Sequence, residues 1–139
     1  MKWGKYMTVL IVEDTAILRK ILRDILVEFC GIPTEDIYEA ADGEKAITEY
    51  ERLKPDVVFL DIAMPKLNGK EAIKMLRAIN PPARIIMCTS SREEHDVMEC
   101  IRAGAKDYLA KPLQPQRVKE AIIKVAADMD PSVLPDAIK

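Results

Sequence analysis

A run of four apolar residues that ends in an acid constrains the fold of this chain more than any other feature. Val57 to Leu60 lie between Asp56 and Asp61, and Pro65 follows closely. The run is too short to span a membrane and too uniformly apolar for a strand with one wet face, so it predicts a strand covered on both faces. Pro65 forces the chain to leave the sheet. Because open α/β sheets bind ligands at the carboxyl ends of their strands, Asp61 is placed to react or to coordinate.

Short strands and helices alternate along the whole sequence. The predicted strands are 6–12, 37–40, 57–60, 84–88 and 108–110, and the predicted helices are 15–29, 43–53, 69–79, 92–102 and 115–129. The first helix has an apolar stripe that we expect to face the sheet, formed by Ile17, Leu18, Ile21, Leu22, Ile25, Leu26 and Phe29. Strict alternation predicts an α/β fold, flavodoxin-like, with a doubly wound five-stranded parallel sheet in the order 2-1-3-4-5 and five helices.

Length and composition predict one compact unit. With 139 residues, 49% of them hydrophobic, the chain can bury one core, and we expect a single domain over 1–129 with its core at 7–129. Residues 130–139 contain two prolines and are expected to be a loosely held tail or the start of a linker. The 21 basic and 23 acidic residues nearly balance, which gives no argument for a nucleic-acid or membrane partner.

Neither the apolar runs nor the cysteines suggest a membrane anchor, a signal peptide or a metal site. No apolar run approaches the roughly 20 residues that a membrane helix needs, so we expect a cytoplasmic protein. The chain has three cysteines, Cys30, Cys88 and Cys100, and their spacing is not that of metal ligands. We therefore expect them to be reduced residues of the apolar core.

The predicted strand order brings acids from two strands together. Glu13 and Asp14 follow the first strand, and Asp61 ends the third, which is its neighbour in the sheet. Three carboxylates a few ångströms apart repel one another, so either some stay protonated or a cation neutralises them. Oxygen ligands without a nearby His or Cys favour a hard ion such as Mg²⁺.

The same edge of the sheet gains a hydroxyl and an ammonium group. Thr89 ends the fourth strand and Lys111 the fifth, and together they offer what an anion such as phosphate needs beside a metal. Phosphoryl transfer depends mainly on in-line positioning and charge neutralisation, so a carboxylate in this place can itself attack phosphorus. Asp61 is therefore assigned as the nucleophile that becomes an aspartyl phosphate.

These residues resemble those of the receiver domain of two-component response regulators, over residues 7 to about 129. The matching positions are Glu13, Asp14, Asp61, Pro65, Gly69, Thr89, Lys111 and Pro112. Within the family, the segments 12–19 and 108–118 are most similar to the stand-alone chemotaxis regulators of the CheY type.

The resemblance implies a phosphoacceptor switch rather than an enzyme. Asp61 would receive its phosphoryl group from a histidine kinase, while Asp14, Asp61 and the backbone carbonyl of Ala63 bind Mg²⁺ and Glu13 acts largely through water. Thr89 and Lys111 would contact the phosphoryl oxygens. Ala63 stands where many relatives carry Asn or another polar residue, which bears on the lifetime of the phosphate.

The resemblance also implies how the signal is passed on. Thr89 would move toward the phosphate and Tyr108 would turn inward, and the bond from Lys111 to Pro112 is often cis in relatives. A protein target would bind the face formed by the helix at 92–102, the strand at 108–110 and the helix at 115–129. We expect a monomer.

Other interpretations of the same residues stay open. Taken singly, Asp61 and Thr89 are typical turn or cap residues, and Lys111 is typical of a solvated surface. An Asp-nucleophile phosphatase would use the same acid and metal but needs a second Asp two residues on, where this chain has Ala63. A nucleotide-binding module would need a Gly-rich loop instead of Glu13-Asp14. The chain could also be the receiver portion of a longer response regulator.

The single histidine bears on where the phosphoryl group comes from. His95 lies among charged residues and is expected to be solvated rather than catalytic. The donor must then be another protein or a small molecule.

Overall fold

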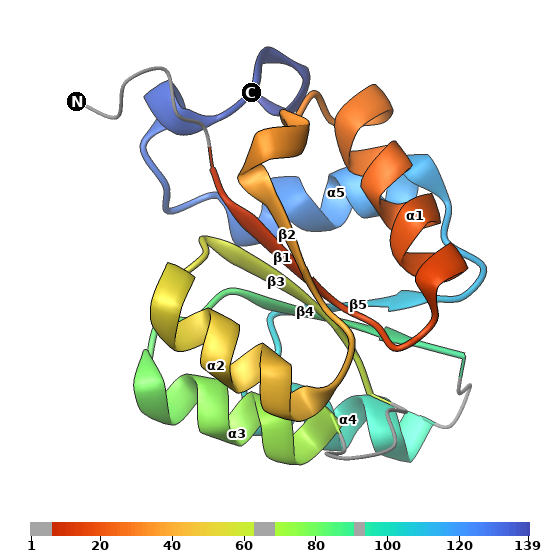
Figure 1. The fold of residues 1–139 in the computed structure, drawn as a ribbon, viewed down its shortest axis with the longest axis vertical. Helices are drawn as coiled ribbons and strands as arrows, with labels where there is room; N and C mark the ends of the chain where they lie inside the picture. The colour runs from red at the N-terminus through yellow and green to blue at the C-terminus, as the bar shows by residue number, and fades with distance from the viewer. Residues whose placement is uncertain (1–6, 63–68, 91–93) are drawn as a thin grey trace.

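The computed structural model describes residues 7–62, 69–90 and 94–139, except for the side chains of 94–96, and has the predicted architecture (Figure 1). The five strands are all parallel and lie in the predicted order β2-β1-β3-β4-β5. The strands are β1 Val9–Val12, β2 Ile37–Ala40, β3 Val57–Asp61, β4 Ile85–Thr89 and β5 Asp107–Ala110. The helices are α1 Ala16–Asp24, α2 Gly43–Leu53, α3 Gly69–Ile79, α4 Glu94–Ala103 and α5 Pro115–Val125.

Helices cover both faces of the sheet, as Figure 1 shows: α1 and α5 lie on one face, and α2, α3 and α4 on the other. Two apolar clusters fill the space between the layers, one on each face. Every residue of β1, β3 and β4 is buried, whereas β2 and β5 have mixed burial. The uniformly apolar runs are therefore the three central strands, as the sequence predicts.

The register of the sheet brings functional strand ends to one level. Val12 of β1 is paired with Leu60 of β3, so the residues that follow them, Glu13 and Asp61, leave neighbouring strands side by side. At the same edge of the sheet, Asp61 of β3 is paired with Cys88 of β4, and Thr89 of β4 is paired with Ala110 of β5.

Local chemistry explains where several helices begin and end. The Asp42 side chain accepts a hydrogen bond from the Lys45 backbone N–H at 2.9 Å and caps α2. Gly104, with φ +125°, ends α4 in a conformation that favours glycine. Gly69 begins α3 so close to β3 that a Cβ there would clash with the backbone of Ile62.

The first helix differs from the prediction of a single helix over 15–29. α1 ends at Asp24 and continues as one π-helical turn over Ile25–Phe29. Leu22 and Leu26 are buried, but Ile17 and Ile21 are 66% and 42% exposed, and Phe29 is exposed as well. The apolar stripe is wider than the sheet face that it covers, so its outer positions reach solvent.

The C-terminal segment packs against the core and is not loosely held. Short 3₁₀ turns at Pro131–Val133 and Asp136–Ile138 place Leu134 and Ile138 in the same apolar cluster as α1 and α5. The Met7 backbone N–H donates to the Val133 carbonyl at 2.9 Å, which ties the segment to the chain just before β1. None of the helices in the described residues is long and apolar enough to cross a membrane.

The packed C-terminal segment predicts a measurable contribution to stability. Ile138 is 3% exposed, so Ile138→Ala should lower the free energy of unfolding by about 2–4 kcal/mol through lost burial and a cavity. Exposed Lys139 is the matched control, and Lys139→Ala should stay within about 0.5 kcal/mol of wild type. Urea unfolding measures both. Equal stabilities of the two variants would contradict the packed arrangement.

Candidate functional site

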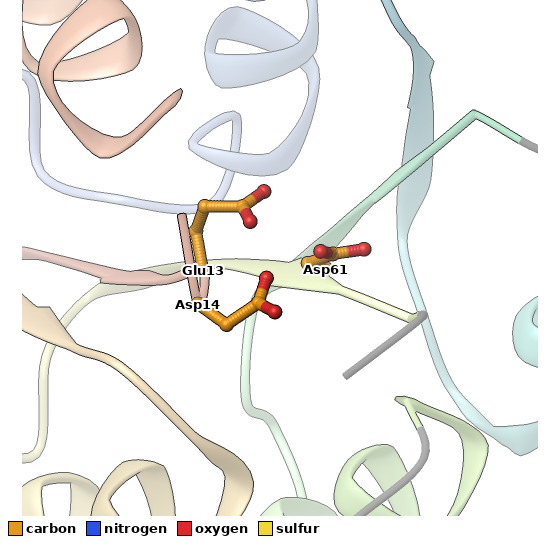
Figure 2. A group of neighbouring side chains, drawn as sticks. All are labelled: Glu13, Asp14 and Asp61. Carbon is orange, nitrogen blue, oxygen red and sulfur yellow. The ribbon is translucent and has the colours of Figure 1, made fainter. Parts of the chain in front are cut away.

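Three carboxylates meet where β1 and β3 end. Glu13, Asp14 and Asp61 each offer an oxygen, and these oxygens all lie within 4.8 Å of one another. Figure 2 shows the three side chains projecting from the two strand ends into one region. Glu13 and Asp61 are buried and Asp14 is exposed, so the group is anchored in the protein and open to solvent on the Asp14 side.

Glu13 is fixed by the protein on both carboxylate oxygens. Its Oε2 accepts the Thr15 backbone N–H at 3.1 Å, and its Oε1 accepts Lys111 Nζ at 2.8 Å. Arg19 donates to the Glu13 carbonyl at 2.7 Å and so holds the turn between β1 and α1. A carboxylate engaged in this way suits an indirect role, through water, better than direct coordination of an ion.

Lys111 brings a positive charge to the site. Its Nζ lies 2.8 Å from Glu13 Oε1 and 3.4 Å from Asp61 Oδ2, so it joins the acids of both strands. Burial works against the charged form, but the hydrogen bond to Glu13 and the charge of Asp61 outweigh it and raise the pKa of Lys111 above its ordinary value. When all four groups are ionised, two negative charges remain unbalanced, which a divalent cation can neutralise.

An apolar cavity of about 270 Å³ adjoins this group under α1. Leu18 and Leu22 of α1 and Phe59 of β3 contribute to its walls, while Glu13, Asp61 and Lys111 also line it. Apolar walls lower the local dielectric constant, which strengthens the interactions of the charged groups. Cys88 lines it too, and burial raises the pKa of its thiol to about 12, which fits the expected inert core residue.

Thr89 and Lys111 end neighbouring strands, as predicted. Thr89 is buried at the end of β4, and its carbonyl accepts the Lys111 backbone N–H at 2.9 Å. The bond from Lys111 to Pro112 is cis, in agreement with the expectation from the family. Tyr108 lies in β5 opposite Met87, and it is 41% exposed. Thr89 and Tyr108 are thus on the two strands that border the site.

Several predicted features fall outside the described residues, including the turn at Pro65 and the start of the helix predicted over 92–102. Ala63, whose carbonyl was expected to bind the metal, lies between the described ranges 7–62 and 69–90. The side chain of His95 is likewise outside them.

A pair of residues that joins β5 to α5 was not singled out in the sequence. Asp107 is buried at the start of β5, and Arg117 of α5 binds both of its oxygens, at 3.1 and 2.9 Å. Burial alone would raise the pKa of Asp107, but the hydrogen bonds from Arg117 and from the Tyr108 backbone N–H lower it below its ordinary value. One feature of the sequence could have pointed to Asp107: it is an acid directly before Tyr108, the predicted switch residue, in the strand that precedes Lys111.

The Lys111 ion pairs predict a pH-dependent contribution to stability. Lys111→Met should lower the free energy of unfolding by about 1–3 kcal/mol at neutral pH, because the carboxylates lose their cation. Since folding raises the pKa of Lys111, this contribution is fully present below 10.5, the ordinary value, and disappears as pH rises through the folded-state pKa. The difference between wild type and variant in urea unfolding should therefore shrink above pH 10.5. Exposed Lys74 is the control, and Lys74→Met should change the free energy of unfolding very little. If Lys111→Met lost no more unfolding free energy than Lys74→Met at neutral pH, the result would contradict this account.

Two chemotaxis proteins are similar in sequence to this chain over most of its length. It is 47% identical over 118 residues to the chemotaxis protein CheY of Thermotoga maritima, covering 85% of this chain and 96% of that protein. It is 43% identical over 116 residues to CheY of Bacillus subtilis, covering 84% of this chain and 94% of that protein. A chain in the crystal structure of the CheX-CheY-BeF₃-Mg²⁺ complex from Borrelia burgdorferi superposes with a TM-score of 0.78 at 32% identity, covering 88% of this chain and 90% of that chain.

The family match spans the whole sheet and nearly all of α5. Residues 9–123 match the family described as the response regulator receiver domain. This range contains Glu13, Asp14, Asp61, Thr89 and Lys111. The chain belongs to the response regulator receiver domain family of two-component signalling and is CheY-like.

Proposed function

We propose that this protein is a phosphoacceptor switch in which Asp61 receives a phosphoryl group from a histidine kinase. The observation that carries the proposal is the gathering of Glu13, Asp14 and Asp61 oxygens within 4.8 Å, with Lys111 Nζ 3.4 Å from Asp61 Oδ2. An isolated buried carboxylate would be a poor phosphoryl acceptor, because an incoming phosphate would be repelled. Here a cation on each side of Asp61, one from the chain and one from solution, would remove that repulsion.

Asp14, Asp61 and the carbonyl of Ala63 would hold Mg²⁺, with Glu13 acting mainly through water. The donor set supports this choice, since it consists of oxygens alone, and the exposed Asp14 leaves room for the waters that Mg²⁺ retains. Bound Mg²⁺ would supply positive charge to the phosphoryl oxygens opposite Lys111. Glu13 is already engaged by Thr15 and Lys111, which supports its indirect role.

The chain's own residues account for the acceptor chemistry. An Asp61 carboxylate oxygen forms the new bond to phosphorus as the bond from phosphorus to the donor nitrogen breaks and the donor leaves with that electron pair. Rigidity helps this step, because β3 is buried along its whole length and fixes the position of Asp61. The Lys111 ammonium and the Thr89 hydroxyl would then bind phosphoryl oxygens.

The output of the switch would be protein binding, in chemotaxis. Thr89 and Tyr108 lie on β4 and β5, so a shift at Asp61 can reach the face made by α4, β5 and α5. Phosphorylation would favour the state in which Thr89 has moved toward the phosphate and Tyr108 has turned inward, and a target would bind that state more tightly. The similarity to CheY proteins of two species supports the chemotaxis role, and the Borrelia complex shows a CheY with a protein partner.

Phosphorylation of Asp61 can be tested without the natural kinase. We expect incubation with Mg²⁺ and phosphoramidate to add the mass of one phosphoryl group to wild type, in an adduct labile to acid and base, and to add none to Asp61→Asn. Asp14→Asn should be labelled at least about tenfold more slowly than wild type, because the neutral amide attracts the Mg²⁺ ion less strongly than the carboxylate does. Asp136 has a fully exposed side chain, so Asp136→Asn serves as the matched control and should label like wild type.

Two results would contradict the proposal. An acid-stable adduct would mean that the acceptor is not a carboxylate. Labelling of Asp61→Asn at the wild-type rate would mean that another residue accepts the group.

A further inference from the structure

Arg117, in the first turn of α5, contacts Tyr108 at two points. Its Nη2 donates to the Tyr108 backbone carbonyl at 2.8 Å, and its Cζ lies 5.9 Å from the centre of the Tyr108 ring. A guanidinium within about 6 Å of an aromatic ring is attracted to it. The guanidinium therefore contacts both the backbone and the ring of the residue that is proposed to turn inward.

Asp107 fixes the guanidinium in this place. Its two oxygens accept from Arg117 Nη1 and Nη2 at 3.1 and 2.9 Å, and the Tyr108 backbone N–H donates to Asp107 Oδ1 at 2.8 Å. Lys124 Nζ is a second, more distant cation, 3.8 Å from Asp107 Oδ1. Because Asp107 is buried and engaged on both oxygens, Arg117 cannot easily follow the ring if the ring moves away.

Only one of these contacts depends on the position of the ring. Rotation about the Tyr108 Cα–Cβ bond moves the ring and leaves the Tyr108 carbonyl and Asp107 in place. The bonds to those two groups therefore contribute equally to both states and cannot shift the equilibrium between them. The contact between guanidinium and ring is lost when the ring turns inward, so it stabilises the outward state alone.

We propose that Arg117 is a positioning residue that holds the Tyr108 ring outward and so sets the ratio of inactive to active protein before phosphorylation. The inference rests on the proposed function, because it requires Tyr108 to be the moving part of the switch. An exposed contact between a cation and an aromatic ring corresponds to about a two- to fivefold change in an equilibrium constant. Arg117 thus tunes the basal output of the switch.

The alternative is that Arg117 merely ties α5 to β5 through Asp107. Lys124 separates the two interpretations, because it is also on α5 and faces the same carboxylate. Removing either cation weakens the tie to Asp107, but only the removal of Arg117 takes a cation from the ring.

The test follows the Tyr108 ring directly. The chain contains four tyrosines, so it is labelled with fluorotyrosine and the Tyr108 signal is assigned by its loss in Tyr108→Phe. Fluorine NMR of the full chain is recorded with and without Mg²⁺ and beryllofluoride as a phosphoryl mimic. In wild type, the mimic should move the signal from the exposed toward the buried environment.

Without the mimic, Arg117→Met should raise the ratio of inward to outward ring about two- to fivefold over wild type. Lys124→Met should leave the ratio unchanged. Arg117→Lys is a second variant in case Arg117→Met does not fold, because it keeps a cation beside Asp107. It lacks the planar guanidinium that reaches the carboxylate and the ring together. It should therefore shift the ratio in the same direction as Arg117→Met. Thermal unfolding verifies that each variant is folded.

The outcomes distinguish this inference from the proposed function. If the Tyr108 signal responds to the mimic but both Arg117 variants keep the wild-type ratio of inward to outward ring, the role of Arg117 is overturned and the Tyr108 switch is not. An equal shift in Lys124→Met would also overturn it, since the effect would then come from the charge around Asp107. A wild-type signal that ignores the mimic would overturn the Tyr108 switch itself, and this inference with it.

Discussion

Repulsion among three carboxylates is the constraint that the rest of this structure has to meet. The oxygens of Glu13, Asp14 and Asp61 lie within 4.8 Å of one another, and among the described residues Lys111 contributes an ammonium group to them. Lys111 reduces the repulsion but leaves an excess of negative charge. The same imbalance that makes the site costly without a cation makes it a good site for one, and the proposed function depends on this property.

The parallel sheet makes this arrangement possible. Pairing of Val12 with Leu60 sets the acids of β1 and β3 at one level, and the bond from the Lys111 N–H to the Thr89 carbonyl joins the ends of β4 and β5. The three central strands are buried throughout, so the groups at their ends are carried by the stiffest part of the molecule. At the opposite end of the sheet, the packed C-terminal segment covers core residues near Met7. Apolar packing is thus extended at the end of the sheet where the C-terminal segment lies, and the charged groups gather at the carboxyl ends of the strands.

The sheet order and the acidic site could be predicted because both follow from short-range patterns. Fully apolar runs mark the central strands, and the acids stand directly after those runs, so the order of the strands is enough to bring Asp14 and Asp61 together. The same reasoning placed Thr89 and Lys111 on neighbouring strand ends, and the match to the receiver family then followed from residues already identified.

The remaining features depend on tertiary packing that no local pattern contains. Ile17 and Ile21 fit an apolar stripe, yet they are exposed, because they lie on a different side of the helix from the buried Leu22. The C-terminal residues contain Pro131 and Pro135, which suggested a loose tail, while the apolar side chains between and after them pack on the core. Arg117 escaped notice because its partners, Asp107 and Tyr108, lie ten and nine residues away on another element.

Paramagnetic broadening by Mn²⁺ tests most directly whether these acids form one cation site. Mn²⁺ takes the same oxygen ligands as Mg²⁺ and broadens the NMR signals of nearby amides. If the account is correct, added Mn²⁺ broadens the backbone amide signals of Asp14 and Asp61 first, spares that of Val133 at the opposite end of the sheet, and is displaced by Mg²⁺. Broadening centred on another part of the chain, or Asp14 and Asp61 signals that stay sharp at saturating Mn²⁺, would contradict it.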